Sequence, residues 1–139
     1  MQGLQLSNSG YVHPAVIEIS RASSIVVLVV EDDLLIRMGV VATIEDAGIE
    51  VVEAANADEA IALLESRPEI TVVFTDIEMP GSMDGLKLAF AVRDRWPPIT
   101  LIVASGRIPP RPDEMPSETT FLRKPYTEAS VIDAVRRTA

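Results

Sequence analysis

The chain has 139 residues, of which 47% are hydrophobic and 24% charged, so it is long enough for one domain with a buried core but not for two. Its net charge of -9 and its 12 scattered Lys and Arg residues exclude the basic surface that nucleic-acid binding requires. It has no Cys, which excludes disulfides and thiolate zinc sites, and no apolar run approaches the roughly 18 residues of a membrane-spanning helix. No basic segment followed by an apolar core opens the sequence, so we expect a single-domain protein of the cytoplasm, with no nucleic-acid or membrane partner.

Residues 1–22 mix Gln, Ser, Asn and Gly with a few aliphatic residues and show no sustained periodicity. We expect a flexible extension there, with a short docked helix as the alternative. His13, the single histidine of the chain, lies in this segment. We interpret His13 more simply as a solvated side chain than as a phosphate donor.

Strands and helices alternate through the rest of the chain. The strands are short apolar runs rich in Val and Ile, as expected for strands covered on both faces, and the helices begin at Asp, Asn or Thr residues suited to capping. In chain order the predicted elements are strand 25–30, helix 34–47, strand 50–54, helix 57–66, strand 71–75, helix 85–95, strand 99–104, strand 119–122 and helix 128–137. This alternation predicts a parallel sheet with helices on both faces.

The segment between the last two strands breaks the alternation. A helix is expected there, but the sequence contains Pro110, Pro112 and Pro116. Each internal proline costs a helix about 3 kcal/mol, because it removes a hydrogen-bond donor and clashes with the preceding turn. We therefore predict that the fourth helix is shortened or missing.

Polar side chains follow four of the predicted strands. Glu31 and Asp32 come directly after the first, and Asp76, Ser105 and Lys124 lie at the ends of three later ones. Because ligands of an open parallel sheet bind outside the carboxyl ends of its strands, we expect these side chains to meet in one crevice. Asp33, next in sequence, has the alternative role of capping the helix that follows.

The residue types in this crevice suit a cation and a phosphoryl group. Two carboxylates about 4 Å apart repel by roughly 4 kcal/mol at an effective dielectric of about 20, so holding Asp32 and Asp76 together requires a cation. Oxygen ligands without Cys or His favour Mg²⁺. We assign Asp32 as a direct metal ligand, Glu31 as a second ligand through water, and Asp76 as the nucleophile that becomes phosphorylated. Lys124 would then neutralise the phosphoryl oxygens, and the Ser105 hydroxyl would donate a hydrogen bond to them.

Four segments resemble the site segments of bacterial response-regulator receiver domains. Any one of them is common, but all four in this order, each at a strand end, are specific, and the resemblance covers about residues 24–138. The segments are Val29-Val30-Glu31-Asp32-Asp33 followed by Arg37, Asp76-Ile77-Glu78-Met79-Pro80 continuing to Met83-Asp84-Gly85, Ala104-Ser105-Gly106, and Phe121-Leu122-Arg123-Lys124-Pro125-Tyr126.

This resemblance implies a doubly wound α/β fold with five parallel strands in the flavodoxin-like order 2-1-3-4-5. It places a receiver domain over residues 23–139, of the stand-alone, chemotaxis-regulator-like type. It also implies that the Lys124-Pro125 peptide bond is cis. In such domains Ser105 would move toward the phosphoryl oxygens while the aromatic residue Phe121 turns inward, which shifts a two-state equilibrium.

The family's roles transfer position by position. By resemblance, Asp76 is the phosphoacceptor, Glu31 and Asp32 are the metal pair, and the backbone carbonyl of Glu78 is a third protein ligand of Mg²⁺. Lys124 matches the ammonium that contacts the phosphoryl group.

Three departures from the family are present. The loop Pro80-Gly81-Ser82-Met83 is one residue longer than its commonest form. Glu78 lies two residues after Asp76, and Arg107 lies two residues after Ser105. We expect these two side chains to pair across the entrance to the site and so to modulate the lifetime of the phosphoryl group. The proline stretch lies where the family has its fourth helix, a part of its common output and dimer face.

The leading functional hypothesis is a receiver in a two-component phosphorelay, not an enzyme acting on other substrates. Its phosphoryl donor would be a histidine kinase or a histidine phosphotransfer protein, and its state a monomer or a phosphorylation-dependent homodimer. Because the sequence ends at Ala139, shortly after the last helix, we expect its signal to leave by contact with a downstream protein. Two alternatives are an Asp-nucleophile phosphatase or phosphotransferase, although such enzymes usually have an Asp where this chain has Glu78, and a degenerate receiver used only for binding.

Overall fold

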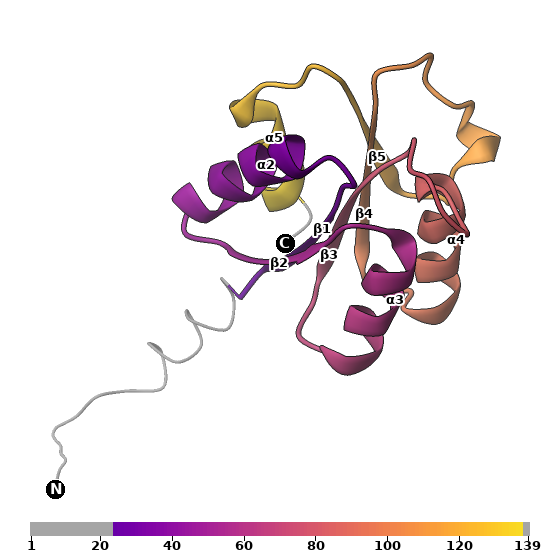
Figure 1. The fold of residues 1–139 in the computed structure, drawn as a ribbon, viewed down its shortest axis with the longest axis horizontal. Helices are drawn as coiled ribbons and strands as arrows, with labels where there is room; N and C mark the ends of the chain where they lie inside the picture. Colours follow the sequence, from indigo (N-terminus) through magenta and orange to yellow (C-terminus); the bar gives the residue numbers. More distant parts are fainter. Residues whose placement is uncertain (1–23, 138–139) are drawn as a thin grey trace, which may run out of the picture.

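Five parallel strands form one sheet in the order β2-β1-β3-β4-β5, which confirms the predicted flavodoxin-like topology (Figure 1). The computed structural model describes residues 24–137, so the expectations for residues 1–22, including His13, lie outside the described residues. The strands are β1 (Val26–Val30), β2 (Glu50–Ala54), β3 (Val72–Asp76), β4 (Thr100–Ser105) and β5 (Thr119–Arg123), and the helices are α2 (Leu34–Asp46), α3 (Ala57–Ser66), α4 (Gly85–Arg95) and α5 (Glu128–Arg136).

The burial of each strand follows its place in the sheet. β1 and β3 are buried along their whole length and β4 along all but its first residue, whereas the edge strands β2 and β5 are partly exposed. This is why the three central strands read as unbroken apolar runs rather than as alternating patterns. The polar residues that end β3 and β4 are therefore placed at the centre of the sheet.

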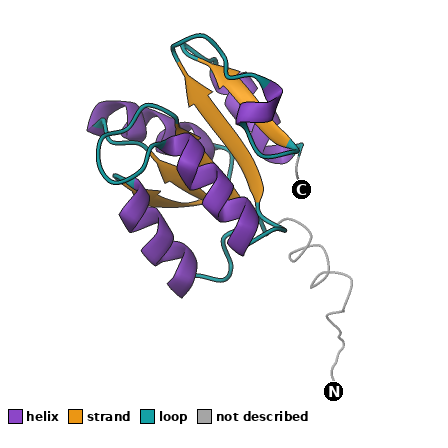
Figure 2. Ribbon diagram, turned by 90° about the vertical axis from the view of Figure 1, so that its right-hand side faces the viewer, coloured by secondary structure: helices purple, strands orange, loops and turns teal. Residues whose placement is uncertain are grey.

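Two apolar cores lie on opposite faces of the sheet, as the two helical layers in Figure 2 show. Alternate residues of each strand enter alternate cores, so Leu28 packs against α3 and α4 while Val29 packs against α2 and α5. None of the described helices is long and apolar enough to cross a membrane.

Each α-helix begins at the cap residue that the sequence predicts. The side chains of Asp33, Asn56, Asp84 and Thr127 each accept a hydrogen bond from the backbone N–H three residues later. Asp33 therefore has the capping role that was its alternative. Fixed helix starts matter for the site, because α2 and α4 both begin within ten residues of its carboxylates.

The helix expected between β4 and β5, the fourth in the family's own count and distinct from α4 here, is missing, as the prolines predict. Within the described residues, β4 and β5 are connected by a segment whose one helical turn is the 3-10 turn Pro112–Glu114. Its Ile108 is 87% exposed, and Phe121 on β5 is only half-buried against the core beneath. Such a connection leaves one side of β5 less covered than a helix would.

Gly85, the first residue of α4, packs closely against the backbone at the end of β3. Its N–H donates to the Ile77 carbonyl at 2.8 Å, and a Cβ at this position would overlap the carbonyl oxygen of Asp76. Only glycine therefore lets α4 begin directly beneath the end of β3.

We expect Gly85→Ala to lower the free energy of unfolding by about 1–3 kcal/mol, the usual cost of forcing an atom into a packed region. The matched control is Gly39→Ala in α2, where an added Cβ meets no atom within 4 Å and should stabilise the helix by up to about 1 kcal/mol. Urea unfolding of the two variants measures the difference. Equal stability of the two variants would contradict the close packing at Gly85.

Candidate functional site

The carboxyl ends of four strands meet at one edge of the sheet and bring the predicted residues together. Asp76 ends β3 and Ser105 ends β4, while Glu31 and Lys124 directly follow β1 and β5. The backbone joins them as well, because the Lys124 N–H donates to the Ser105 carbonyl at 2.9 Å. The Lys124-Pro125 bond is cis, as expected.

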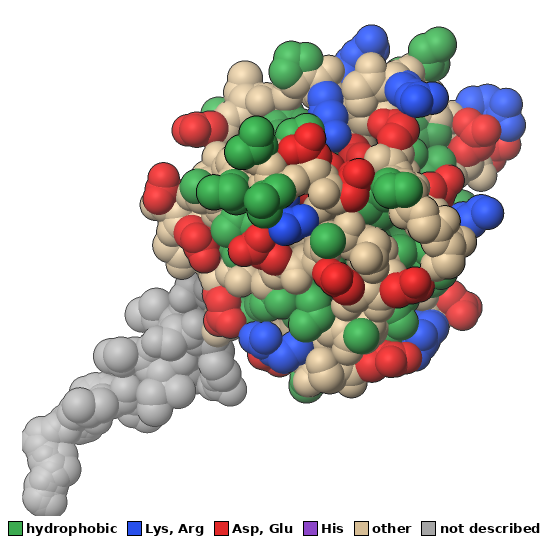
Figure 3. Space-filling view, in the orientation of Figure 1, with side chains coloured by type: hydrophobic (Ala, Val, Ile, Leu, Met, Phe, Trp, Pro, Cys, Tyr) green, Lys and Arg blue, Asp and Glu red, His purple; other side chains and the backbone are tan. Residues whose placement is uncertain are grey.

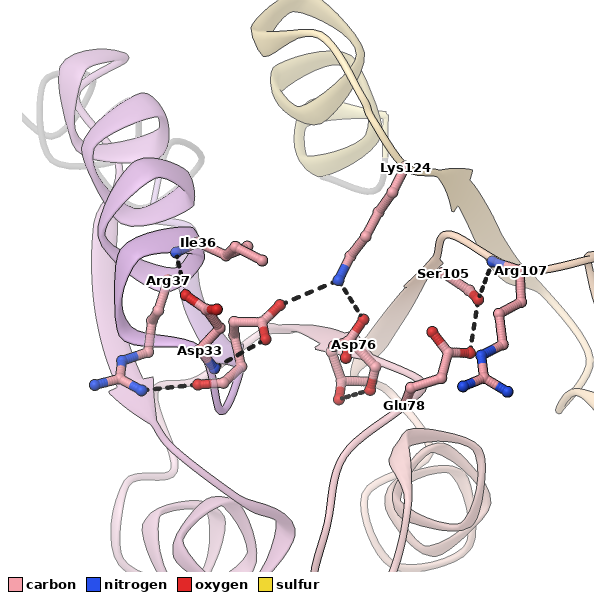
Figure 4. Close-up of polar contacts among 10 residues, drawn as sticks. Asp33, Ile36, Arg37, Asp76, Glu78, Ser105, Arg107 and Lys124 are labelled. Carbon is pink, nitrogen blue, oxygen red and sulfur yellow. Dashed lines mark hydrogen bonds and ion pairs between the residues drawn. The ribbon is translucent and has the colours of Figure 1, made fainter.

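Lys124 reaches across the sheet to two carboxylates. Its Nζ lies 2.6 Å from Asp76 Oδ1 (Figure 4) and 3.4 Å from Glu31 Oε1. The side chains of Glu31 and Asp76 are only 6% and 5% exposed, so these ion pairs are poorly screened by solvent. One ammonium thus connects β5 with both β1 and β3.

Three carboxylates of the site lie close enough to share one metal ion. One oxygen each of Glu31, Asp32 and Asp76 lies within 4.8 Å of the others, and Asp32 is exposed at the entrance. Apart from the Lys124 ammonium, no N–H or O–H of the described residues reaches the buried Oδ1 of Asp76. An all-oxygen set with excess negative charge fits a hard divalent cation such as Mg²⁺.

The charges of the site shift its pKa values. Burial raises the pKa of Asp76 above 3.8 despite the attraction of Lys124, and Glu78 and Asp32 raise it further by repulsion. Burial, together with repulsion from Asp76, also raises the pKa of Glu31. Burial opposes the charge of Lys124, but its contacts with Asp76 and Glu31 outweigh this and raise its pKa. The site therefore contains more negative charge than one ammonium balances, which favours a bound cation.

The two residues expected to modulate the site, Glu78 and Arg107, do not pair with each other. No ion pair joins them among the described residues. Instead the Ser105 hydroxyl lies between them, donating to Glu78 Oε2 at 2.6 Å and accepting from the backbone N–H of Arg107 at 3.0 Å (Figure 4). The predicted ion pair is thus replaced because the hydroxyl is nearer and is itself a good donor to a carboxylate.

Arg37 has a structural role at the site that the sequence alone did not reveal. Its guanidinium donates to the backbone carbonyl of Glu31 at 2.7 Å and to Glu53 Oε1 on β2 at 3.1 Å. It therefore fixes the turn that carries Glu31 and Asp32. The sequence feature that could have indicated this role is the place of Arg37 in the first of the four segments that resemble receiver domains.

Comparison with known proteins agrees with this geometry. The model of the response regulator receiver domain matches residues 27–136, so the chain belongs to the response regulator receiver domain family. It is 34% identical over 116 residues to the response regulator protein FleR of Pseudomonas aeruginosa, covering 81% of this chain and 24% of FleR. The sensor kinase CckA of Brucella abortus is 38% identical over 86 residues, covering 61% of this chain and 9% of CckA. The chain thus spans about a quarter or less of the length of these relatives.

Solved structures show the same fold. A response regulator receiver protein from Sinorhizobium medicae superposes with a TM-score of 0.78 and 26% identity, covering 84% of this chain and 95% of that one. The receiver domain of the hybrid histidine kinase CckA superposes with a TM-score of 0.69 and 28% identity, covering 81% and 97%.

We expect Arg37→Ala to destabilise the protein by about 1–3 kcal/mol, because it leaves the Glu31 carbonyl without its charged donor. Arg67→Ala is the matched control, since Arg67 also pairs with a glutamate of β2, Glu50, but does so at the exposed surface. Its expected cost is below about 1 kcal/mol. Thermal or urea unfolding measures both, and an Arg37→Ala variant no less stable than Arg67→Ala would contradict the positioning role.

Proposed function

We propose that this chain is a receiver that accepts a phosphoryl group from a phosphohistidine donor onto Asp76 and signals by contact with a downstream protein. The observation that carries the proposal is the group of three carboxylates, of Glu31, Asp32 and Asp76, two of which pair with the Lys124 ammonium. Membership of the receiver family supports it further. A cytoplasmic location, and a monomer or phosphorylation-dependent dimer, stay predictions.

Mg²⁺ is the proposed cofactor. Glu31, Asp32 and Asp76 would hold it with their carboxylates, together with the backbone carbonyl of Glu78. When bound, such a cation neutralises phosphoryl oxygens and so lowers the repulsion between the donor and the acidic site. The oxygen-only ligand set and the excess negative charge support this assignment.

The residues of the chain supply the rest of the proposed chemistry. A carboxylate oxygen of Asp76 attacks the phosphorus of the donor, the P–N bond breaks, and its electron pair returns to the histidine ring nitrogen. The product is an acyl phosphate on Asp76. Lys124, already 2.6 Å from Asp76 Oδ1, is placed to neutralise the phosphoryl oxygens, and Ser105 to donate a hydrogen bond to them.

The two alternatives explain the site less well. A phosphatase with an Asp nucleophile needs a free acid or base two residues later, but Glu78 accepts a hydrogen bond from Ser105 instead. A degenerate binding module has no need of the ion pair between Lys124 and the buried Asp76 carboxylate. We therefore propose that the chain promotes only its own phosphorylation and dephosphorylation and does not turn over other substrates.

Incubation with Mg²⁺ and acetyl phosphate should add one acid-labile phosphoryl group per native chain, detected by intact mass spectrometry. Asp76→Asn should gain none, because it lacks the nucleophile, and removal of the metal with a chelator should abolish the reaction of the native protein. Repeated turnover without a stoichiometric adduct would support the phosphatase. No reaction would support the degenerate module.

We further propose that the phosphoryl donor docks on the amino-terminal end of α2. Four apolar side chains near the start of α2 are exposed, which is an unusual concentration of exposed apolar surface. They are Leu34 (56% exposed), Leu35 (78%), Ile36 (40%) and Met38 (54%). Apolar side chains gather over α2 in Figure 3. Ile36 also lines a hollow with Lys124, so a protein bound here lies beside Asp76. A donor must approach Asp76 this closely to transfer its phosphoryl group.

We expect Leu35→Ser to slow phosphotransfer from a histidine kinase by about 5- to 30-fold, the effect of losing a central apolar contact of about 1–2 kcal/mol. Phosphorylation by acetyl phosphate, which needs no docking surface, should keep its native rate. Phe90→Ser is the matched control, because Phe90 is 46% exposed but belongs to α4 on the other face. Equal phosphotransfer rates for the two variants would contradict docking on α2.

A further inference from the structure

We propose that Glu78 is a latch that changes partners when Asp76 is phosphorylated. The Glu78 carboxylate then gives up its hydrogen bond with the Ser105 hydroxyl and pairs with the guanidinium of Arg107. This inference rests on the proposed function and goes beyond it, because it identifies the two side-chain arrangements between which the receiver switches. In the unphosphorylated arrangement Glu78 binds Ser105. In the phosphorylated one it binds Arg107.

The first step is that the backbone of Ser105 is fixed. Ser105 is 1% exposed, and its carbonyl accepts from the Lys124 N–H at 2.9 Å. The preceding carbonyl, of Ala104, accepts from the Ile77 N–H at 2.9 Å. Both neighbouring strands therefore hold this end of β4, so a response of Ser105 to phosphorylation is confined largely to its hydroxyl.

The second step is that this hydroxyl is already engaged. A serine hydroxyl has one proton to donate. Here it is directed to Glu78 Oε2 at 2.6 Å, a length typical of a hydroxyl bound to a carboxylate, while Oγ accepts from the Arg107 N–H at 3.0 Å. Ser105 cannot donate this proton to a phosphoryl oxygen until its hydrogen bond to Glu78 is broken.

The third step is that a phosphoryl group displaces Glu78. Attached to Asp76, it carries a charge of about -1.5 to -2 and three strong acceptor oxygens, so it competes for the Ser105 proton. It also repels the Glu78 carboxylate, which already raises the pKa of Asp76 by repulsion when only one carboxylate is present there. Both effects act in the same direction and release Glu78 from Ser105.

The fourth step is that the structure provides a new position for Glu78. Glu78, Ser105 and Arg107 line one hollow of about 320 Å³, and Pro109 and Pro110 line it as well. In the described part of the chain no carboxylate pairs with Arg107, so its guanidinium is available beside the hollow. Figure 4 shows both side chains on the same side of Ser105. Because no helix connects β4 and β5, the proline segment lines this hollow and would contact Glu78 in its new position.

Titration with beryllium fluoride in the presence of Mg²⁺ tests the latch, because this anion mimics a phosphoryl group on an aspartate. Calorimetry should give an affinity about tenfold higher for Glu78→Ala than for the native chain, the value of one charge-assisted hydrogen bond that no longer has to be broken. Glu78→Gln, which keeps an acceptor without the charge, should show a smaller gain. Glu114→Gln, which removes a carboxylate of the same hollow without a contact to Ser105, should stay within about twofold of native.

The second arm tests the new partner of Glu78. Arg107→Ala should weaken beryllium fluoride binding in the native background but have no effect in the Glu78→Ala background, since the partner exchange is already lost there. An unchanged or weaker affinity of Glu78→Ala, an equal gain for Glu114→Gln, or the same Arg107→Ala effect in both backgrounds would overturn the latch. Failure of the native chain to bind beryllium fluoride or to react with acetyl phosphate would instead overturn the proposed function.

Discussion

The ammonium of Lys124, held between Asp76 and Glu31, is the contact on which the rest of the site depends. It joins the ends of β5, β3 and β1, and it is the one cation inside a group of three carboxylates in the described structure. Buried carboxylates without a counter-charge would be forced toward protonation, as the raised pKa values of Asp76 and Glu31 already indicate. One ammonium reduces this repulsion but does not cancel it. The remaining negative charge is the basis of the proposed affinity for a divalent cation and of the proposed need for that cation before an anionic phosphoryl group can approach.

The fold holds these charges together with backbone contacts at the same end of the sheet. Gly85 lets α4 begin against the Asp76 carbonyl, and Arg37 fixes the carbonyl of Glu31 at the start of α2. The Lys124 N–H is bound to the Ser105 carbonyl, so the backbone of the cationic residue is joined to that of the hydroxyl residue. Because the backbone around the site is held in this way, the proposed switch acts through side chains. In that proposal, a change of partner at one hydroxyl is enough to report phosphorylation.

Much of the fold follows from local chemistry that the sequence displays. Unbroken Val and Ile runs predict the central strands because both of their faces are buried, and Asp33, Asn56, Asp84 and Thr127 predict the helix starts because each caps its helix. Pro110, Pro112 and Pro116 predict the loss of the fourth helix. The convergence of the strand-end residues follows from the topology of a parallel sheet. The contact of Glu78 with Ser105 could not be predicted in this way, because it depends on side-chain rotation within a few ångströms; charge alone favoured Arg107.

A crystal structure of the native chain with Mn²⁺ in place of Mg²⁺ tests the central claim most directly, because manganese has a measurable anomalous signal and accepts the same oxygen ligands. The account predicts an anomalous peak bounded by the carboxylates of Asp32 and Asp76, with Lys124 on the opposite side of Asp76. Crystals of the Asp32→Asn variant should show a weaker peak or none. A native structure without a peak among these carboxylates, or with the metal bound elsewhere on the acidic surface, would contradict it.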